Sequence, residues 1–126
     1  MKRVISTTAA PGAVGPYSQA TEANGFVFVS GQLPLDPATG AFVSDDIAEQ
    51  AEQCIRNLLA VLGAAGCKAE DVVKTTVFMI DIGDFSVVNE IYARYFNSEC
   101  PARCAMQVSA LPKGALIEIE AIAAKP

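Results

Sequence analysis

Residues 115–123 alternate between two kinds of side chain, and this alternation constrains the fold more than any other feature of the sequence. Successive side chains of a β-strand point to opposite faces of its sheet. One face of this predicted strand would carry only apolar side chains, whereas the other would carry Glu118 and Glu120. We expect the apolar face to pack against helices and the glutamate face to line a site or an interface.

A second predicted strand, residues 102–108, also carries a charge in its interior. Its apolar face, which includes Cys104, should pack against the helices. Arg103 would then project to the other face, together with Glu118 and Glu120. Two interpretations remain open at this point: an arginine–glutamate ion pair that fixes the register between subunits, or a cleft in which Arg103 binds a small carboxylate.

Apolar residues spaced by three and four predict two helices. The first runs from Asp46 to Ala65, and Asp46 with Glu49 forms a start that resembles a capping box. Asp84 would cap a second helix, whose apolar stripe consists of Phe85, Val88, Ile91, Tyr92 and Tyr95.

The remaining apolar runs predict further strands at residues 18–22, 26–30 and 72–80, with a possible short strand at 2–6. The order ββαβαββ indicates an α+β, two-layer sandwich, in which two helices cover one face of a mixed, mostly antiparallel sheet. A length of 126 residues favours one domain, residues 1–126.

Two of these strands, residues 26–30 and 72–80, carry apolar side chains at both parities, as strands buried on both faces do. Two helices cover only one face. We therefore expect a second copy of the chain to cover the other face in a homo-oligomer. The alternative is a curled, barrel-like sheet that covers itself.

Composition excludes several kinds of function. The net charge of −5 and the nine scattered basic residues argue against nucleic-acid binding, and no apolar run approaches the ~20 residues of a membrane span. The chain has no histidine, so acid–base chemistry must come from other groups. We expect the four cysteines to be free, mostly buried thiols in a reducing cytoplasm. Cys100 and Cys104 lack the further pair that a metal site needs.

Several short motifs together resemble one known family. They are Gly15-Pro16-Tyr17-Ser18-Gln19, Val29-Ser30-Gly31-Gln32, Lys74-Thr75-Thr76-Val77-Phe78, Val88-Asn89 with Tyr92, Pro101-Ala102-Arg103, and Ile117-Glu118-Ile119-Glu120-Ala121. The combination is similar to the RidA family, also called YjgF/YER057c/UK114, the reactive-intermediate deaminases. The resemblance covers most of the chain.

The resemblance implies a chorismate-mutase-like fold that forms a homotrimer, with one site in each cleft between subunits. It also implies hydrolysis of 2-enamines and 2-imines, such as 2-iminobutanoate and 2-iminopropanoate, to 2-oxo acids and ammonia. No cofactor is implied.

The same resemblance suggests roles for individual residues. Arg103 would hold the substrate carboxylate, and Glu118 would orient the attacking water. The family usually has cysteine or a similar small residue two residues after the arginine; this chain has Ala105, which would serve if that position contributes its backbone carbonyl. The other pocket-lining positions are Tyr17, Ser30, Gly31 and Asn89.

Two other functions remain as alternatives. The first is a trimer that binds small carboxylates without catalysis, as a metabolite sensor. The second is an RNA-cleaving translation inhibitor, which the negative charge and the lack of histidine argue against.

Overall fold

Six strands form one open sheet in the order β1-β2-β3-β6-β4-β5 in the computed structural model, which describes residues 1–126. Only β4 and β5 pair in parallel, and every other neighbouring pair is antiparallel. The strands are β1 (Arg3–Ile5), β2 (Ala20–Ala23), β3 (Phe26–Gln32), β4 (Val72–Met79), β5 (Ala102–Gln107) and β6 (Ile117–Ala124). The mixed, mostly antiparallel sheet is confirmed, and the alternative of a sheet closed on itself is wrong.

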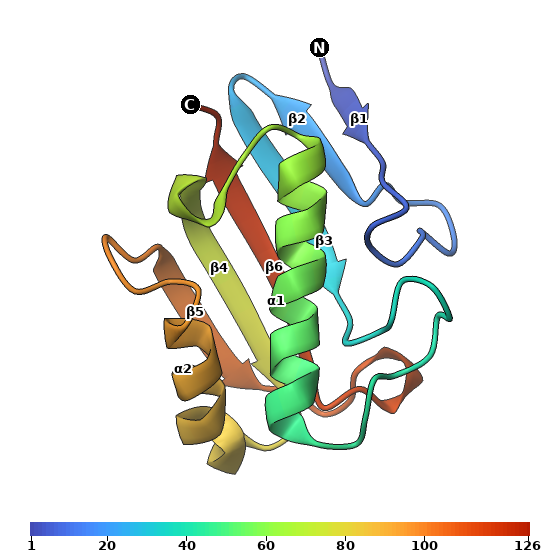
Figure 1. Cartoon of the computed structure of the whole chain (residues 1–126), viewed down its shortest axis with the longest axis vertical. Coiled ribbons are helices and arrows are strands. Elements are labelled where there is room, and N and C mark those ends of the chain that lie inside the picture. Colours follow the sequence, from blue (N-terminus) through green and yellow to red (C-terminus); the bar gives the residue numbers. More distant parts are fainter.

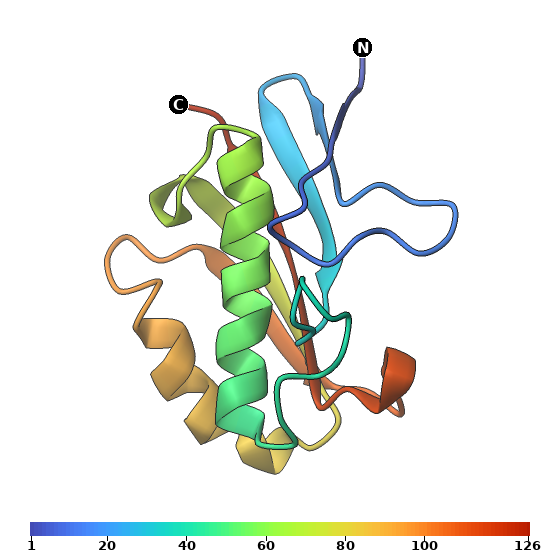
Figure 2. The ribbon, with the colours of Figure 1, turned by 45° about the vertical axis from the view of Figure 1, so that its right-hand side comes forward.

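Two helices, α1 (Ile47–Ala64) and α2 (Phe85–Ala93), lie against one face of the sheet (Figure 1), and the turned view shows the same two layers (Figure 2). The predicted cap of α1 is confirmed, since the Asp46 carboxylate accepts a hydrogen bond from the Glu49 N–H. The predicted side-chain cap of α2 is wrong: Asp84 makes no such bond. A short 3₁₀ turn (Ile82–Asp84) precedes α2, and Asp81 caps that turn instead.

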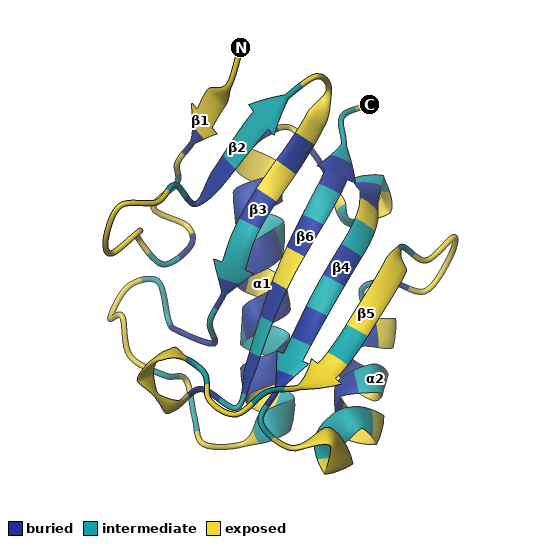
Figure 3. Ribbon diagram, turned by 180° about the vertical axis from the view of Figure 1, so that it is seen from behind, coloured by how far each residue is buried: buried dark blue, intermediate teal, exposed yellow.

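The core lies between the sheet and the two helices, with β6 and α1 at its centre. Alternate residues of β6 are buried on the helix side, as the alternation predicted, and they are Ile117, Ile119, Ala121 and Ala123. Seen from behind, the same strand shows buried segments separated by more exposed ones (Figure 3). The face of the sheet away from the helices therefore carries the side chains of opposite parity, including Glu118 and Glu120.

This open face exposes large apolar side chains. Phe26 and Phe28 of β3 are 43% and 45% exposed, and Met106 of β5 is 38% exposed. Isolated apolar side chains are common on protein surfaces, but several on one sheet face indicate an interaction surface. The expectation that a second copy covers this face remains a prediction.

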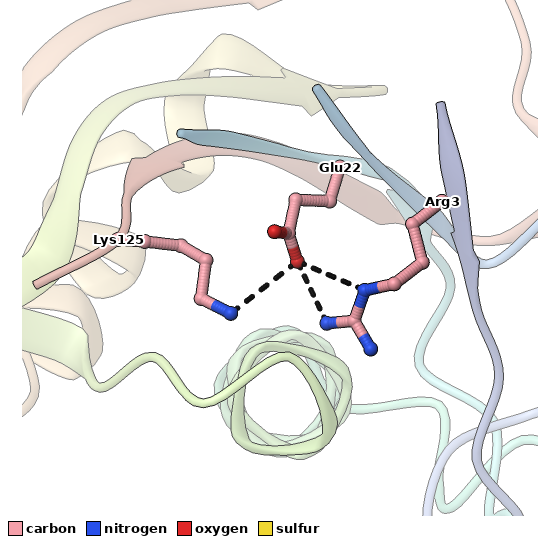
Figure 4. Close-up of polar contacts among 3 residues, drawn as sticks. All are labelled: Arg3, Glu22 and Lys125. Carbon is pink, nitrogen blue, oxygen red and sulfur yellow. Dashed lines mark hydrogen bonds and ion pairs between the residues drawn. The ribbon is translucent and has the colours of Figure 1, made fainter. Parts of the chain in front are cut away.

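A cluster of charges joins the two ends of the chain beside the end of α1 (Figure 4). The Glu22 Oε1 atom accepts hydrogen bonds from Arg3 Nη2 at 2.7 Å and Nε at 3.2 Å, and from Lys125 Nζ at 3.4 Å. Glu22 thus links β1, β2 and the residue after β6. The hydrogen bond from Arg3 is the main reason that the pKa of Glu22 lies below its usual value, and Lys125 adds to the effect.

We predict that Glu22→Gln removes a stabilisation that depends on pH. Because the folded-state pKa of Glu22 is lowered, its stabilisation is present above the unfolded-state pKa of about 4.3 and is lost as pH falls through the folded-state pKa. Thermal unfolding should show a small advantage of the wild type at pH 7 that disappears in strong acid. Glu90→Gln is the control, since Glu90 makes no ion pair; an equal pH dependence in both variants would contradict the prediction.

Candidate functional site

A pocket of about 590 Å³ lies where the end of β3 and the start of β6 meet three connecting segments. It gathers four of the residues that the motifs suggested: Tyr17, Ser30, Gly31 and Glu118. Its other lining residues are Pro11, Gly12, Val14, Gln19, Gln32, Leu33, Leu35, Pro112, Lys113 and Glu120. Arg103, Asn89 and Ala105 do not line it.

Gly31 belongs to a bulge in β3, because the register between β3 and β6 shifts between Val29 and Gln32. A Cβ atom on Gly31 would lie 2.8 Å from the Glu118 Cδ and would overlap its Oε2. The family resemblance suggested only that Gly31 lines the pocket. The structure gives a further reason for glycine here, which is the room that the Glu118 carboxyl group occupies.

The Glu118 side chain is half-buried and makes no hydrogen bond or ion pair within the chain. Burial raises the pKa of its carboxyl group, and the nearby charge of Glu120 raises it further. A raised pKa brings a carboxyl group closer to the range in which it can both accept and donate a proton near neutral pH. The arrangement therefore suits acid–base chemistry better than a solvated carboxylate would.

Hydrogen bonds fix the strand end beside this carboxyl group. The Ser30 hydroxyl donates to the Ser18 carbonyl at 2.6 Å, and the Ser30 N–H donates to the Gln19 carbonyl at 2.9 Å. Tyr17 directly precedes Ser18 in the same loop, and its side chain is 52% exposed. Its ring stands at the pocket rim, and its hydroxyl accepts a bond of 3.4 Å from the Val14 N–H.

Buried amide side chains hold two of the three segments that form the pocket walls. The Gln19 amide donates to the Thr7 and Pro11 carbonyls at 3.0 and 2.8 Å and accepts from the Thr7 N–H at 2.7 Å. From α1, the Asn57 amide donates to the carbonyls of Leu33 and Leu35, both at 2.9 Å. Since buried polar groups are costly unless satisfied, these bonds fix the loops in place.

Arg103 lies elsewhere, on the helix side of the sheet. Its Nη1 donates to the Asn89 side-chain carbonyl at 2.7 Å. The guanidinium carbon lies 5.2 Å from the centre of the Phe85 ring and 4.8 Å from that of Tyr92. All three partners belong to α2, and the arginine side chain remains exposed.

The prediction that Arg103 shares a face with Glu118 and Glu120 is wrong. In the β4–β5 pairing Arg103 lies opposite Thr75, whose hydroxyl contacts α2 through Tyr92, whereas Glu118 lies opposite Phe78 on the open face. The apolar pattern gave the wrong face for Arg103 because β5 is an edge strand beside α2, where the side that faces the helix is not fully buried. There the helix-facing side accommodates a guanidinium group against aromatic rings.

The other residues of β5 follow from the same correction. Cys104 is exposed on the open face and not packed against the helices, whereas Ala105 packs against the core. The Val108 N–H donates to the Met79 carbonyl. Backbone groups of a strand alternate in direction, so those of Ala105 point to the free edge of the sheet. A carbonyl group that points to the free edge is consistent with the role that the family resemblance implies for Ala105.

Two residues that hold Arg103 were missed as site residues, although the sequence contained a signal for them. Phe85 and Tyr92 were interpreted only as part of an apolar stripe. Their spacing from Asn89, four and three residues, places all three on one face of a helix. An asparagine between two aromatic residues on that face is the feature that could have indicated a binding role.

Two further findings concern other classes of site. No helix combines the length and the apolar character required to cross a membrane. No three cysteine, aspartate or glutamate side chains come together in a way that could hold a metal ion.

The fold is that of a two-layer α+β protein. Its pocket is open, has the size of a small molecule and contains a half-buried carboxyl group, so the class of protein is a small-molecule-binding α+β domain. A family model described as endoribonuclease L-PSP matches residues 7–125. A human protein named 2-iminobutanoate/2-iminopropanoate deaminase is 55% identical over 123 residues, which cover 98% of this chain and 90% of the human one.

Solved structures of related proteins have the same fold as this chain. A protein of the conserved Rid family from Yersinia pestis superposes with a TM-score of 0.96 at 51% identity, covering 98% of this chain and 99% of that one. Escherichia coli TdcF, solved with bound serine, superposes with a TM-score of 0.94 at 41% identity over 98% and 99% of the two chains. The chain belongs to this family, the RidA family that its motifs indicated.

We predict that Gly31→Ala displaces the Glu118 carboxyl group without unfolding the protein. The clashing atoms are the end of a flexible side chain, so Glu118 should rotate away, and the free energy of unfolding should fall by only about 1 kcal/mol. A crystal structure and a thermal melt test this. Gly12→Ala is the matched control, because a Cβ there meets nothing within 4 Å; an unmoved Glu118 in Gly31→Ala would contradict the prediction.

Proposed function

We propose that the protein hydrolyses 2-imino acids and their enamine tautomers to 2-oxo acids and ammonia, with 2-iminobutanoate and 2-iminopropanoate as substrates. The observation that carries the proposal is the unpaired, half-buried Glu118 carboxyl group with a raised pKa in a pocket of small-molecule size. The deaminase names of the human and other mammalian relatives support the reaction. The serine in the TdcF title supports a small ligand that carries a carboxylate.

The proposed chemistry needs no cofactor and no histidine, because an iminium carbon is already electrophilic. Glu118 accepts a proton from water as the water oxygen bonds to the imine carbon, which yields a carbinolamine. The protonated Glu118 then returns the proton to the nitrogen. The C–N bond breaks as the ionised Glu118 takes the hydroxyl proton, so that the hydroxyl group becomes a carbonyl group and ammonia leaves, and Glu118 then releases that proton to the solvent. Such proton transfer contributes on the order of 10²–10⁴ in rate.

Arg103 would bind the substrate carboxylate, since a guanidinium group pairs with a carboxylate through two parallel hydrogen bonds. Within one chain, however, Arg103 and Glu118 point to opposite faces of the sheet. A site that uses both groups therefore requires two chains. Arg103 is exposed on the edge strand β5, from which it can reach the pocket of a neighbour.

The assembly we propose is a homotrimer with a chorismate-mutase-like arrangement, in which the open faces of the sheets meet. The exposed Phe26, Phe28 and Met106 side chains on that face favour it. Tyr17, Ser30 and Gly31 would come from the chain that supplies Glu118, and Asn89 and Ala105 from the chain that supplies Arg103. We further propose a cytoplasmic location, where imines released by dehydratases arise and free thiols persist.

The first test measures ammonia release from imines generated in situ by a threonine dehydratase. We expect the protein to accelerate release above the spontaneous rate. Glu118→Gln should lose most of the acceleration, roughly 10²-fold or more, and Arg103→Ala should raise KM. Rates equal to the spontaneous rate would reject the deaminase, and carboxylate binding without turnover would favour the sensor. RNA cleavage that survives in both variants would favour the endoribonuclease alternative.

A second test addresses the shared site. Arg103→Ala and Glu118→Gln chains, unfolded together in equal amounts and refolded, should regain roughly one quarter of wild-type activity, because random mixing pairs an intact Arg103 with an intact Glu118 at one site in four. Each variant refolded alone is the control. A mixture as inactive as its components would argue that both groups act within one chain.

A further inference from the structure

The guanidinium group of Arg103 contacts three side chains of α2, although the arginine side chain is exposed to solvent. Phe85 and Tyr92 place their rings 5.2 and 4.8 Å from its central carbon, and Asn89 accepts a 2.7 Å hydrogen bond from its Nη1. Aromatic faces attract cations, and Arg stacks on them more often than Lys does. The three contacts come from successive turns of α2, so one rigid element supplies all of them.

The holding residues are themselves fixed. The Tyr92 hydroxyl lies 2.7 Å from the Thr75 hydroxyl, and both residues are buried. The Tyr92 ring also packs at 4.6 Å against Phe96. Phe85 packs against the core at the start of α2. A side chain that contacts this surface is therefore restricted by groups that cannot readily move.

We propose that Phe85, Asn89 and Tyr92 are positioning residues, which orient the Arg103 guanidinium group before a carboxylate ligand arrives. The inference rests on the proposed function of Arg103 as the carboxylate-binding group. A free arginine side chain loses much rotational freedom when it binds a ligand, and a side chain that is already ordered loses less. Asn89 occupies one Nη atom, which leaves the remaining N–H groups for the ligand.

The test uses the unreactive product 2-oxobutanoate and the full-length protein. Calorimetry should show that Phe85→Leu binds it about fivefold more weakly, since the ring face is lost while apolar volume remains. Phe85→Tyr keeps the ring and should restore wild-type affinity. In the deaminase assay, Phe85→Leu should raise KM by the same factor and leave kcat unchanged, because Glu118 is untouched. NMR relaxation of the Arg103 Nε should report greater mobility in Phe85→Leu alone.

Val88→Ala is the matched control for helix stability. Val88 is buried on α2 and is not one of the three residues that hold the Arg103 guanidinium group, so its truncation should lower Tm without changing the affinity for 2-oxobutanoate. Equal affinity of Phe85→Leu and wild type would overturn the proposal, as would a loss of affinity in Val88→Ala as large as that in Phe85→Leu. A wild type that binds no 2-oxobutanoate would overturn it too. A wild type that binds the acid but hydrolyses no imine would reject only the deaminase.

Discussion

The packing of β6 against α1 is the interaction on which the rest of the structure depends. Ile117 and Ile119 are fully buried beneath the helix, and their burial fixes which face of the strand every other residue occupies. Glu118, between them, must then project to the open face. A register shift of one residue would bury the carboxyl group and expose both isoleucines, so the burial of the isoleucines favours the register that places the carboxyl group in the pocket.

The sequence predicted the elements well because each has a strong local signal: period two in the strands, three and four in the helices, and an aspartate before α1. It failed where position depends on distant parts of the chain. The pocket walls are loops without periodicity, held by buried amides such as Gln19 and Asn57. The face of Arg103 was mispredicted because alternation gives two sets of side chains without saying which set meets a helix.

The two faces of the sheet carry different functional groups. The open face supplies the Glu118 carboxyl group beside Gly31. Its raised pKa means that the folded state binds the proton more tightly than the unfolded state does, so ionisation of this group lowers the free energy of unfolding. The helix face supplies a guanidinium group that aromatic rings stabilise. Each half is built on regular secondary structure, which holds side chains more precisely than loops do.

The charge cluster of Arg3, Glu22 and Lys125 has a practical consequence for handling the protein. Both chain ends emerge together at one end of the molecule, opposite the turn at Pro112–Gly114 that borders the pocket (Figure 1). An affinity tag, a fluorescent domain or a surface-attachment sequence can therefore be fused before Met1 or after Pro126 without obstructing the pocket entrance.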